Sequence, residues 1–324
     1  MSPNLKQIRE PIQEEMKTFE KQFHEALKSK VPLLDRVMRF LVKRKGKQVR
    51  PLFVFLTAGT TGGIQPSTYR GAVLMELIHT ATLVHDDVVD DAYQRRGFFS
   101  INALWKNKIA VLAGDYLLSR SLLHSLENDD FLMLKKASEA IKLMSEGELL
   151  QIEKARSLNV NEDLYFDIIR RKTASLIASS CAIGAFSNNC SEEEIETMRT
   201  FGEKAGIAFQ IKDDLLDFGD NKSGKPALND IKEKKVTLPM IYTLQNTGKK
   251  ERKSIISTLK KHNKNRQKVD EVIEKVYQTG GIEYARNLMY QYRDEAFALI
   301  ENFEENTYKA SLKDLVNFSI NRDR

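Results

Sequence analysis

The sequence predicts an all-α protein. Apolar residues recur with helical periodicity over most of the chain, and strand-like alternation and Asn-Gly hairpin turns are few. Seven prolines and sixteen glycines are also too few for a β-sandwich of 324 residues. The periodic segments predict helices over roughly Pro11–Lys28, Leu33–Val42, Pro51–Thr60, Ser67–Asp90, Ile101–Ser125, Phe131–Lys154, Glu162–Phe186, Ser191–Phe218, Leu238–Leu244, Lys268–Gln278 and Ile282–Phe303.

One domain spanning residues 1–324 is expected, because no Pro/Gly-rich linker and no low-complexity tract divides the chain. Gly219–Leu228 contains Asn, Ser, Gly and Pro together, so a loop is predicted there. Gly280-Gly281 is predicted to separate two helices. The longest uncharged run, Thr173–Ser191, is interrupted by Ser, Thr and Asn. It predicts a closely packed interior helix rather than a membrane span.

The composition is that of an ordinary globular protein, with 41% hydrophobic and 30% charged residues. Lys and Arg number 51 against 45 Asp and Glu, which leaves a formal charge of +6. This excess favours anionic partners and does not choose between nucleic acid, a membrane surface and a phosphorylated small molecule. Cys181 and Cys190 lack metal-ligand spacing and are predicted to be free thiols. The N-terminus lacks an apolar signal segment, so a cytoplasmic location is expected.

Two similar aspartate clusters are the main chemical signal in the sequence. Leu83–Asp90 (LVHDDVVD) and Gln210–Asp217 (QIKDDLLD) each end an apolar helical run with the pattern DDxxD. The first cluster consists of Asp86, Asp87 and Asp90, and the second of Asp213, Asp214 and Asp217. Residues four apart lie about 40° apart around a helix, so the first and last aspartates of each cluster point the same way. The middle aspartate lies to the side, where it can bind from an angle or support the ligands.

These clusters predict a metal site. Like charges four apart repel each other, and unpaired carboxylates in largely buried sequence are costly, so a cation would relieve both problems. Carboxylate oxygens without nearby Cys or paired His favour Mg²⁺, which shares its coordination with substrate phosphates. One DDxxD alone is more often a solvated acidic face. Two such clusters predict a clamp for a diphosphate.

Short basic motifs supply candidate diphosphate-binding residues. Lys47 and Arg50 stand at the start of a helix that Pro51 can open, where backbone N–H groups favour anions. Arg95 and Arg96 follow the first cluster closely, and Arg can bind phosphate oxygens in a bidentate manner. Taken alone, these motifs fit a solvated turn or a nucleic-acid patch equally well.

Further candidates lie near the second cluster: Lys172, Thr173, Gln210, Lys225 and Lys235. Each could be a surface residue, and the proximity to the aspartates is what favours a role in binding. His79 lies seven residues, or two helical turns, before the first cluster. A lone helix histidine is as often a core residue, so both interpretations stay open.

In combination these motifs resemble those of the trans-prenyl diphosphate (polyprenyl) synthases. The resemblance runs from about Leu33 to the last helices and rests on GKQVRP, HTATLVHDDVVDDAYQRRG, RRKTASL, GIAFQIKDDLLDF and GKPALNDIKEKKVTLP. It implies the isoprenoid synthase fold, a single-domain bundle of mostly antiparallel helices around a deep apolar cavity. It also implies a homodimer, with residues 1–30 expected to be related to dimer formation. The implied activity joins an allylic diphosphate to isopentenyl diphosphate with three Mg²⁺ ions.

The resemblance assigns roles by position. The metal ligands would be Asp86, Asp90, Asp213 and Asp217. The residues that hold isopentenyl diphosphate would be Lys47, Arg50, His79 and Arg96. Those that hold the allylic diphosphate would be Arg95, Lys172, Thr173, Gln210 and Lys235. The six aspartates, Lys172 and Lys235 are therefore the expected catalytic residues, and neither nucleic acid nor stable membrane insertion is expected.

Product length depends, in the resembling family, on side chains four or five residues before the first aspartate cluster. Here these are Thr82 and Ala81, both small. They favour a long all-trans product of the kind that supplies quinone side chains, grown from farnesyl or geranylgeranyl diphosphate.

Alternatives remain open. They are a short-chain synthase, a class I terpene cyclase, a non-catalytic regulatory subunit and a nucleic-acid-binding helical protein. A cyclase normally carries a different second metal motif, and a regulatory subunit typically loses acids from one cluster. Nucleic-acid binding would leave both aspartate clusters without a role.

Overall fold

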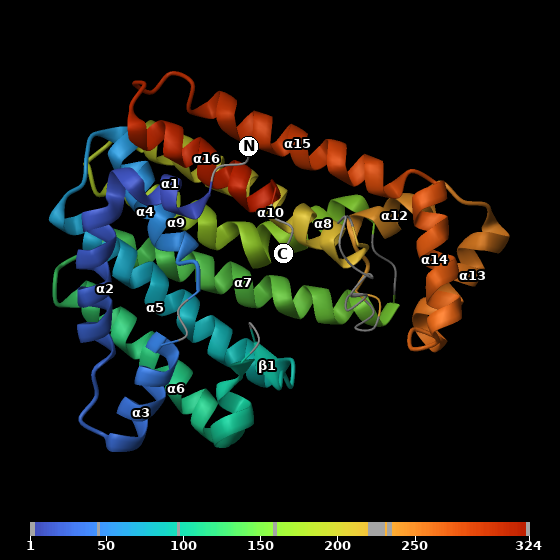
Figure 1. Ribbon diagram of the computed structural model, residues 1–324, viewed down its shortest axis with the longest axis horizontal. Coiled ribbons are helices and arrows are strands. Elements are labelled where there is room, and N and C mark those ends of the chain that lie inside the picture. The colour runs from blue at the N-terminus through green and yellow to red at the C-terminus, as the bar shows by residue number, and fades with distance from the viewer. Residues whose placement is uncertain are drawn as a thin grey trace.

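The computed structural model describes residues 4–43, 46–95, 98–157, 161–219, 231 and 235–321. Its helices are α1 (Leu5–Arg9), the 3₁₀ turn η1 (Glu10–Ile12), α2 (Gln13–Leu27), α3 (Pro32–Lys43), α4 (Val49–Thr61), α5 (Pro66–Val89), α6 (Ile101–Leu126), α7 (Phe131–Ser157), α8 (Glu162–Ile169), the π-helical turn η2 (Arg170–Ala174), α9 (Ser175–Phe186), α10 (Glu192–Asp217), α12 (Leu238–Gln245), α13 (Lys249–Lys261), α14 (Arg266–Gln278), α15 (Gly281–Leu299) and α16 (Thr307–Asn321). Two short strands, β1 (Gln94–Arg95) and β2 (Phe98–Phe99), pair antiparallel. Figure 1 shows the long helices lying side by side, with α13 and α14 at one end of the molecule.

The all-α prediction is confirmed, and most predicted helices agree with the structure to within a few residues. The predicted helix Glu162–Phe186 is wrong in one respect, because η2 interrupts it between α8 and α9. The predicted helices also lacked α1, α13 and α16, and the hairpin of β1 and β2 was not predicted. Gly280 separates α14 from α15 as expected, in a left-handed conformation with φ of 79° that favours glycine. Most of the predicted loop Gly219–Leu228 lies outside the described residues.

Buried apolar side chains form two clusters, which α10 connects. Met198 and Phe201 of α10 belong to the first cluster, with residues of α4, α5 and α9. Ile207 and Ile211, further along the same helix, belong to the second, with residues of α12, α14 and α15. Because α10 carries its aspartates at its C-terminal end, this packing determines where they lie.

The helix α9 is interior, as the uncharged run predicted. Each of its residues from Ser175 to Ala185 is buried. Cys181 lies among them, and burial raises the pKa of its thiol to about 12, so the thiol stays protonated at neutral pH. Cys181 and the half-buried Cys190 are both free thiols. In the part of the chain that the structure describes, no helix combines the length and apolar character that crossing a bilayer requires.

A buried lysine holds the turn between α15 and α16. Lys309 has no exposed surface, and its Nζ donates to the backbone oxygens of Glu301 at 2.9 Å and Phe303 at 2.7 Å. It also donates to the carboxylate of Glu305 at 2.6 Å. The ammonium group therefore satisfies carbonyl groups that the turn leaves outside any helix.

Replacing Lys309 by methionine should lower the free energy of unfolding by about 2–3 kcal/mol, because the carbonyl oxygens of Glu301 and Phe303 lose their charged donor. Urea unfolding followed by circular dichroism measures the change. Lys313→Met is the matched control, since Lys313 forms only a partly exposed ion pair with Glu301, at 3.3 Å. Its loss should cost less than about 1 kcal/mol. Equal destabilisation by the two variants would contradict this role of Lys309.

Candidate active site

The second aspartate cluster lies at the C-terminal end of α10. The helix ends at Asp217, so Asp213 and Asp217 keep their helical spacing. Asp214 is buried, and its carboxylate accepts hydrogen bonds from separate elements of the fold. The donors are the Tyr165 hydroxyl at 2.8 Å, the Gln210 side-chain amide at 3.1 Å and the Leu238 backbone N–H at 3.4 Å. Of the two roles open to the middle aspartate, this geometry favours support of its neighbours.

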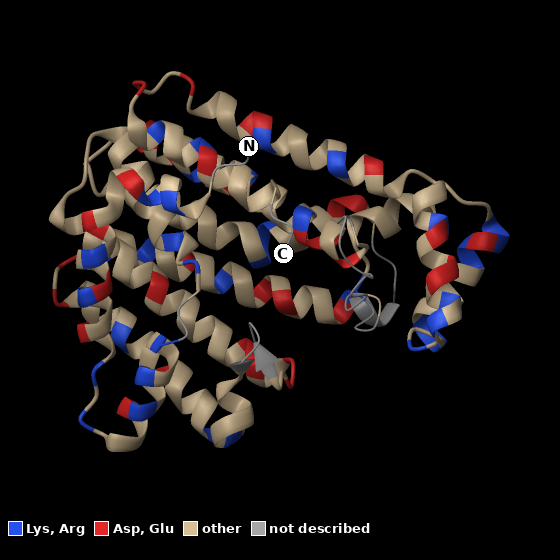
Figure 2. Ribbon diagram, in the orientation of Figure 1, with Lys and Arg blue, Asp and Glu red and all other residues tan. Residues whose placement is uncertain are grey.

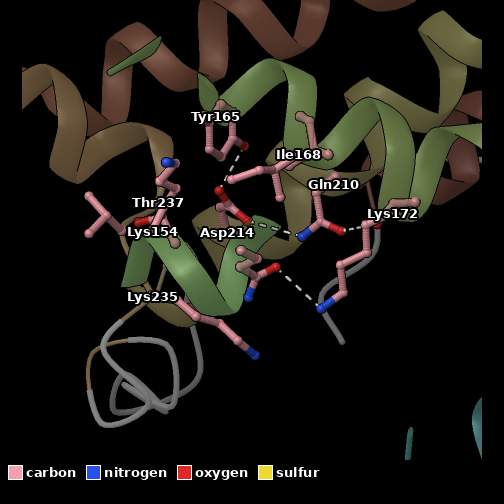
Figure 3. A pocket seen from close by; sticks show the side chains of 12 residues that line it. Lys154, Tyr165, Ile168, Lys172, Gln210, Asp214, Lys235 and Thr237 are labelled. Carbon is pink, nitrogen blue, oxygen red and sulfur yellow. Dashed lines mark hydrogen bonds between the residues drawn. The ribbon is translucent and has the colours of Figure 1, made fainter. Parts of the chain in front are cut away.

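A chain of hydrogen bonds links the π-helical turn to this cluster, as Figure 3 shows. The Thr173 hydroxyl donates to Gln210 Oε1 at 2.7 Å, and Gln210 then donates to Asp214. The oxygen and the nitrogen of the Gln210 side-chain amide therefore both form hydrogen bonds within the protein. The π turn brings Thr173 into this position, and such turns occur often at functional sites.

Three lysines surround the same pocket, which has a volume of about 200 Å³. Lys172 lies on η2, Lys154 on α7, and Lys235 in the segment before α12 (Figure 3). Lys172 donates to Gln151 of α7 at 3.3 Å and forms an ion pair with Glu148. The pocket thus has positive side chains on three separate elements beside the Asp214 carboxylate, an arrangement suited to an anion that carries metal.

The first aspartate cluster lies at the C-terminal end of α5. Asp90 caps the helix, and its backbone N–H donates to the Asp86 carbonyl at 2.8 Å, so the helical spacing persists to the last aspartate. Asp86 is half-buried, Asp87 is buried and Asp90 is exposed. These three residues are not part of the lining of the lysine pocket.

His85, the residue before the first aspartate cluster, packs closely against α6. His85 Nε2 lies 3.3 Å from the Val111 backbone oxygen and 3.4 Å from Asp115 Oδ1. The ring rests over Gly114, where an added Cβ would lie 2.1 Å from His85 Nε2. Because only glycine leaves room for the ring, α6 sets the position of the backbone next to Asp86.

The other predicted residues are distributed along α4, α5 and β1. Lys47 is exposed beside the start of α4, and Arg50 is half-buried in its first turn. His79 is buried in α5. Arg95 belongs to β1. Arg96 and Lys225, both assigned to diphosphate binding, lie outside the described residues.

The two predicted chain-length residues both lie on α5. Ala81 is fully buried and Thr82 is half-buried. The Thr82 hydroxyl donates to the His79 carbonyl at 2.9 Å, so this side chain is held close to its own helix. Their role in product length stays a prediction.

Residues 31–276 match the family model of the polyprenyl synthetases. The chain belongs to this family. Octaprenyl diphosphate synthase from Escherichia coli (strain K12) is 31% identical over 323 residues, which cover 99% of this chain and 100% of that protein. Geranylgeranyl diphosphate synthase from Saccharolobus solfataricus is 34% identical over 311 residues, or 91% of this chain and 92% of that one.

A solved structure shows the same polyprenyl synthase fold. It is the polyprenyl synthase from Caulobacter crescentus CB15 complexed with calcium and isoprenyl diphosphate, which is 28% identical. It superposes with a TM-score of 0.91 and covers 100% of this chain and 99% of that chain. The helical bundle described above is therefore the fold of the polyprenyl synthetase family.

The side chains of the two clusters fit a hard divalent cation, because every predicted ligand is a carboxylate oxygen. Among the described residues, no group of three or more His, Cys, Asp or Glu side chains is close enough to hold an ion on its own.

Several residues of the pocket escaped the sequence patterns. Tyr165, which orients Asp214, lies seven residues before Lys172, and this two-turn spacing was the available signal. Glu148 and Gln151 lie on α7, more than twenty residues before the lysine they contact. No local pattern pairs residues that far apart along the chain.

Gly114→Ala should lower kcat of this polyprenyl synthetase about 10- to 100-fold, because the new methyl group displaces His85 and shifts Asp86. Steady-state assays and thermal unfolding measure the two effects separately. Alanine favours the helix by roughly 1 kcal/mol, so lost turnover should not reflect lost helix. Gly248→Ala is the matched control, since nothing lies within 4 Å of its Cβ. Unchanged kcat in Gly114→Ala would exclude this packing as a determinant of the site.

Proposed function

We propose that this protein condenses an allylic diphosphate, farnesyl or geranylgeranyl, with successive isopentenyl diphosphates to give a long-chain all-trans polyprenyl diphosphate. The observation that carries the proposal is the lysine pocket, where Lys172, Thr173 and Lys235 surround the hydrogen-bonded Gln210–Asp214 pair. Family membership and the octaprenyl diphosphate synthase relative support the same reaction. We also propose that the protein acts in the cytoplasm. Its product would supply the side chains of quinones.

In this mechanism the protein holds the allylic diphosphate and excludes water. Lys172 and Lys235 neutralise charge that develops on the diphosphate as the allylic C–O bond ionises. Thr173 and Gln210 keep Asp214 in place. The isopentenyl double bond attacks the allylic cation, and the released diphosphate takes the proton from the resulting tertiary cation. Apolar walls protect both cations from water.

The metal ligands would be Asp86 and Asp90 from α5 and Asp213 and Asp217 from α10. When bound, Mg²⁺ supplies Lewis-acid stabilisation of the leaving diphosphate, and three ions are proposed. The supporting observation is that carboxylates of each cluster keep the helical spacing that points them the same way. The calcium complex of the Caulobacter crescentus polyprenyl synthase supports binding of a hard cation by this fold.

Isopentenyl diphosphate is assigned to Lys47, Arg50, His79 and Arg96. Lys47 and Arg50 flank the start of α4, where the positive end of the helix dipole adds to anion binding. Holding the second substrate in line with the allylic carbon converts the condensation into an effectively unimolecular step.

A short-chain product is the second candidate, because the geranylgeranyl diphosphate synthase relative is also similar over most of its length. The small Ala81 and Thr82 favour the long product.

Residues 1–324 are proposed as one domain, since α10 contributes to both apolar clusters.

The decisive experiment incubates the protein with labelled isopentenyl diphosphate, farnesyl diphosphate and Mg²⁺, and sizes the products by chromatography. We expect chains of six or more isoprene units, and no product after treatment with EDTA. Products of three or four units would support the short-chain candidate. A cyclised hydrocarbon, or no product in the presence of Mg²⁺, would overturn the proposal.

A homodimer is also proposed, formed through α6 and α7. Most of the exposed large apolar side chains of the described residues lie on these two helices. They are Leu104, Val111, Leu112, Leu122, Leu123, Leu126, Phe131, Leu132, Leu143, Leu149 and Ile152. Exposed apolar side chains concentrated on two helices indicate an interaction surface, and a two-fold axis lets the same surface cover its own copy. Residues 1–30, for which a role in the dimer was expected, place Ile8, Phe19 and Leu27 in the core.

Light scattering should give twice the 37.1 kDa chain mass for the wild type and a monomer for Leu112→Arg. The buried charge would lack a partner in the dimer, which is why the variant should dissociate. Val31→Arg places the same charge on an exposed residue outside α6 and α7 and should remain dimeric. A monomeric wild type would refute the dimer.

A further inference from the structure

Both ends of the chain contact the segment that carries Lys47. The Arg9 guanidinium of α1 donates to the Lys47 backbone oxygen at 2.8 Å. The Lys47 ammonium lies 5.0 Å from the centroid of the Phe318 ring of α16. One residue from each terminal helix therefore acts on Lys47, the first on its backbone and the second on its side chain.

The backbone around Lys47 needs such support. Gln48, the next residue, is buried and has a left-handed conformation with φ of 51°. This conformation is unfavourable for a residue other than glycine and persists only where surrounding contacts maintain it. It also turns the chain into α4, so it sets the direction of Lys47 relative to Arg50.

The two terminal helices are themselves well anchored. Ile8, next to Arg9, is fully buried, and Figure 1 shows α1 beside α16. The Tyr308 ring of α16 lies over Gly59 of α4, where an added Cβ would lie 2.3 Å from the ring. Each terminal helix thus has a packed residue of its own, Ile8 in α1 and Tyr308 in α16, which holds Arg9 and Phe318 in defined positions beside Lys47.

We propose that Arg9 and Phe318 are positioning residues for isopentenyl diphosphate. They fix Lys47, so the isopentenyl site is assembled from both ends of the chain. The proposal rests on the proposed function of Lys47. The proposed allylic site uses residues of β1, η2, α10 and the segment before α12, and none of these residues makes the contacts described for Arg9 and Phe318. The two substrates should therefore respond differently when the contacts are removed.

The test uses Phe318→Leu, which keeps an apolar side chain but removes the aromatic face, and Arg9→Met, which removes only the guanidinium. KM for isopentenyl diphosphate should rise about three- to tenfold in each. KM for farnesyl diphosphate, and kcat at saturating isopentenyl diphosphate, should stay within about twofold of the wild type. Phe318→Tyr keeps the ring face and should restore the wild-type KM.

Phe297→Leu is the matched control. Phe297 also packs against the first apolar cluster and also faces a cation, Arg293, at 6.0 Å, but it belongs to α15. This variant should lose thermal stability without a change in either KM. An equal rise in KM for isopentenyl diphosphate in Phe297→Leu would overturn the proposal, because the effect would then be one of general stability.

Lys47→Ala separates this inference from the proposed function. If Lys47→Ala raises KM for isopentenyl diphosphate while Phe318→Leu and Arg9→Met do not, the positioning role is wrong and the function of Lys47 stands. If Lys47→Ala changes nothing in an active enzyme, the isopentenyl assignment itself fails. Combining Lys47→Ala with Phe318→Leu should add no further effect, because the ring acts through the ammonium group.

Discussion

Replacing Asp86 by alanine should lower kcat at least about 100-fold while the protein remains folded. Asp86 is the first aspartate of the cluster at the end of α5 and is assigned as a metal ligand. Without its carboxylate, charge on the leaving diphosphate would be stabilised less in the transition state than in the wild type. The residue is half-buried at a helix end, so its removal leaves no large cavity.

Steady-state turnover at saturating Mg²⁺ measures the effect, and circular dichroism checks the fold. Asp270→Ala is the control, since Asp270 forms an exposed i, i+4 ion pair with Arg266 on α14. It should change kcat less than about twofold. Wild-type turnover in a folded Asp86→Ala variant would exclude a ligand role for this residue.

Replacing Ala81 by phenylalanine should shorten the product by several isoprene units. Ala81 lies five residues before Asp86 and is fully buried, so a ring at this position must project into the interior of the bundle. If the growing chain passes this side of α5, the ring blocks it, and release occurs earlier. Overpacking should also reduce stability by about 1–3 kcal/mol.

Product sizing after incubation with isopentenyl and farnesyl diphosphates measures the distribution. Ala296→Phe is the matched control, because Ala296 is equally buried but lies on α15. It should lose stability and keep the wild-type products. An unchanged distribution in Ala81→Phe would mean that other residues limit the product length.

Local sequence was sufficient for the elements of the fold that depend on neighbouring residues. The periodicity of Ile101–Ser125 predicted α6 almost to its ends, and the small uncharged residues before Phe186 predicted the buried helix α9. The same local rule placed Asp86 with Asp90 on one side of a helix, because a spacing of four is a property of the helix itself.

Other features of the site depend on contacts that are distant in sequence. Tyr165 binds Asp214 across 49 residues, and Lys172 meets Gln151 across 21. The π turn that brings Thr173 to Gln210 interrupts a segment whose pattern reads as one continuous helix. Which residues become hydrogen-bond partners here depends on how separate helices pack together. The hydrophobic periodicity of a single segment therefore does not predict them.

The sequence by itself determined the helical class, the two aspartate clusters and their basic companions, since each depends on residue type and short spacing. Only the tertiary structure decided that Asp214 faces inward, that Gly114 receives the His85 ring, and that Arg9 and Phe318 converge on Lys47. The physical reason is that these contacts join separate helices. Their geometry follows from how whole helices pack, which no single segment of the chain specifies.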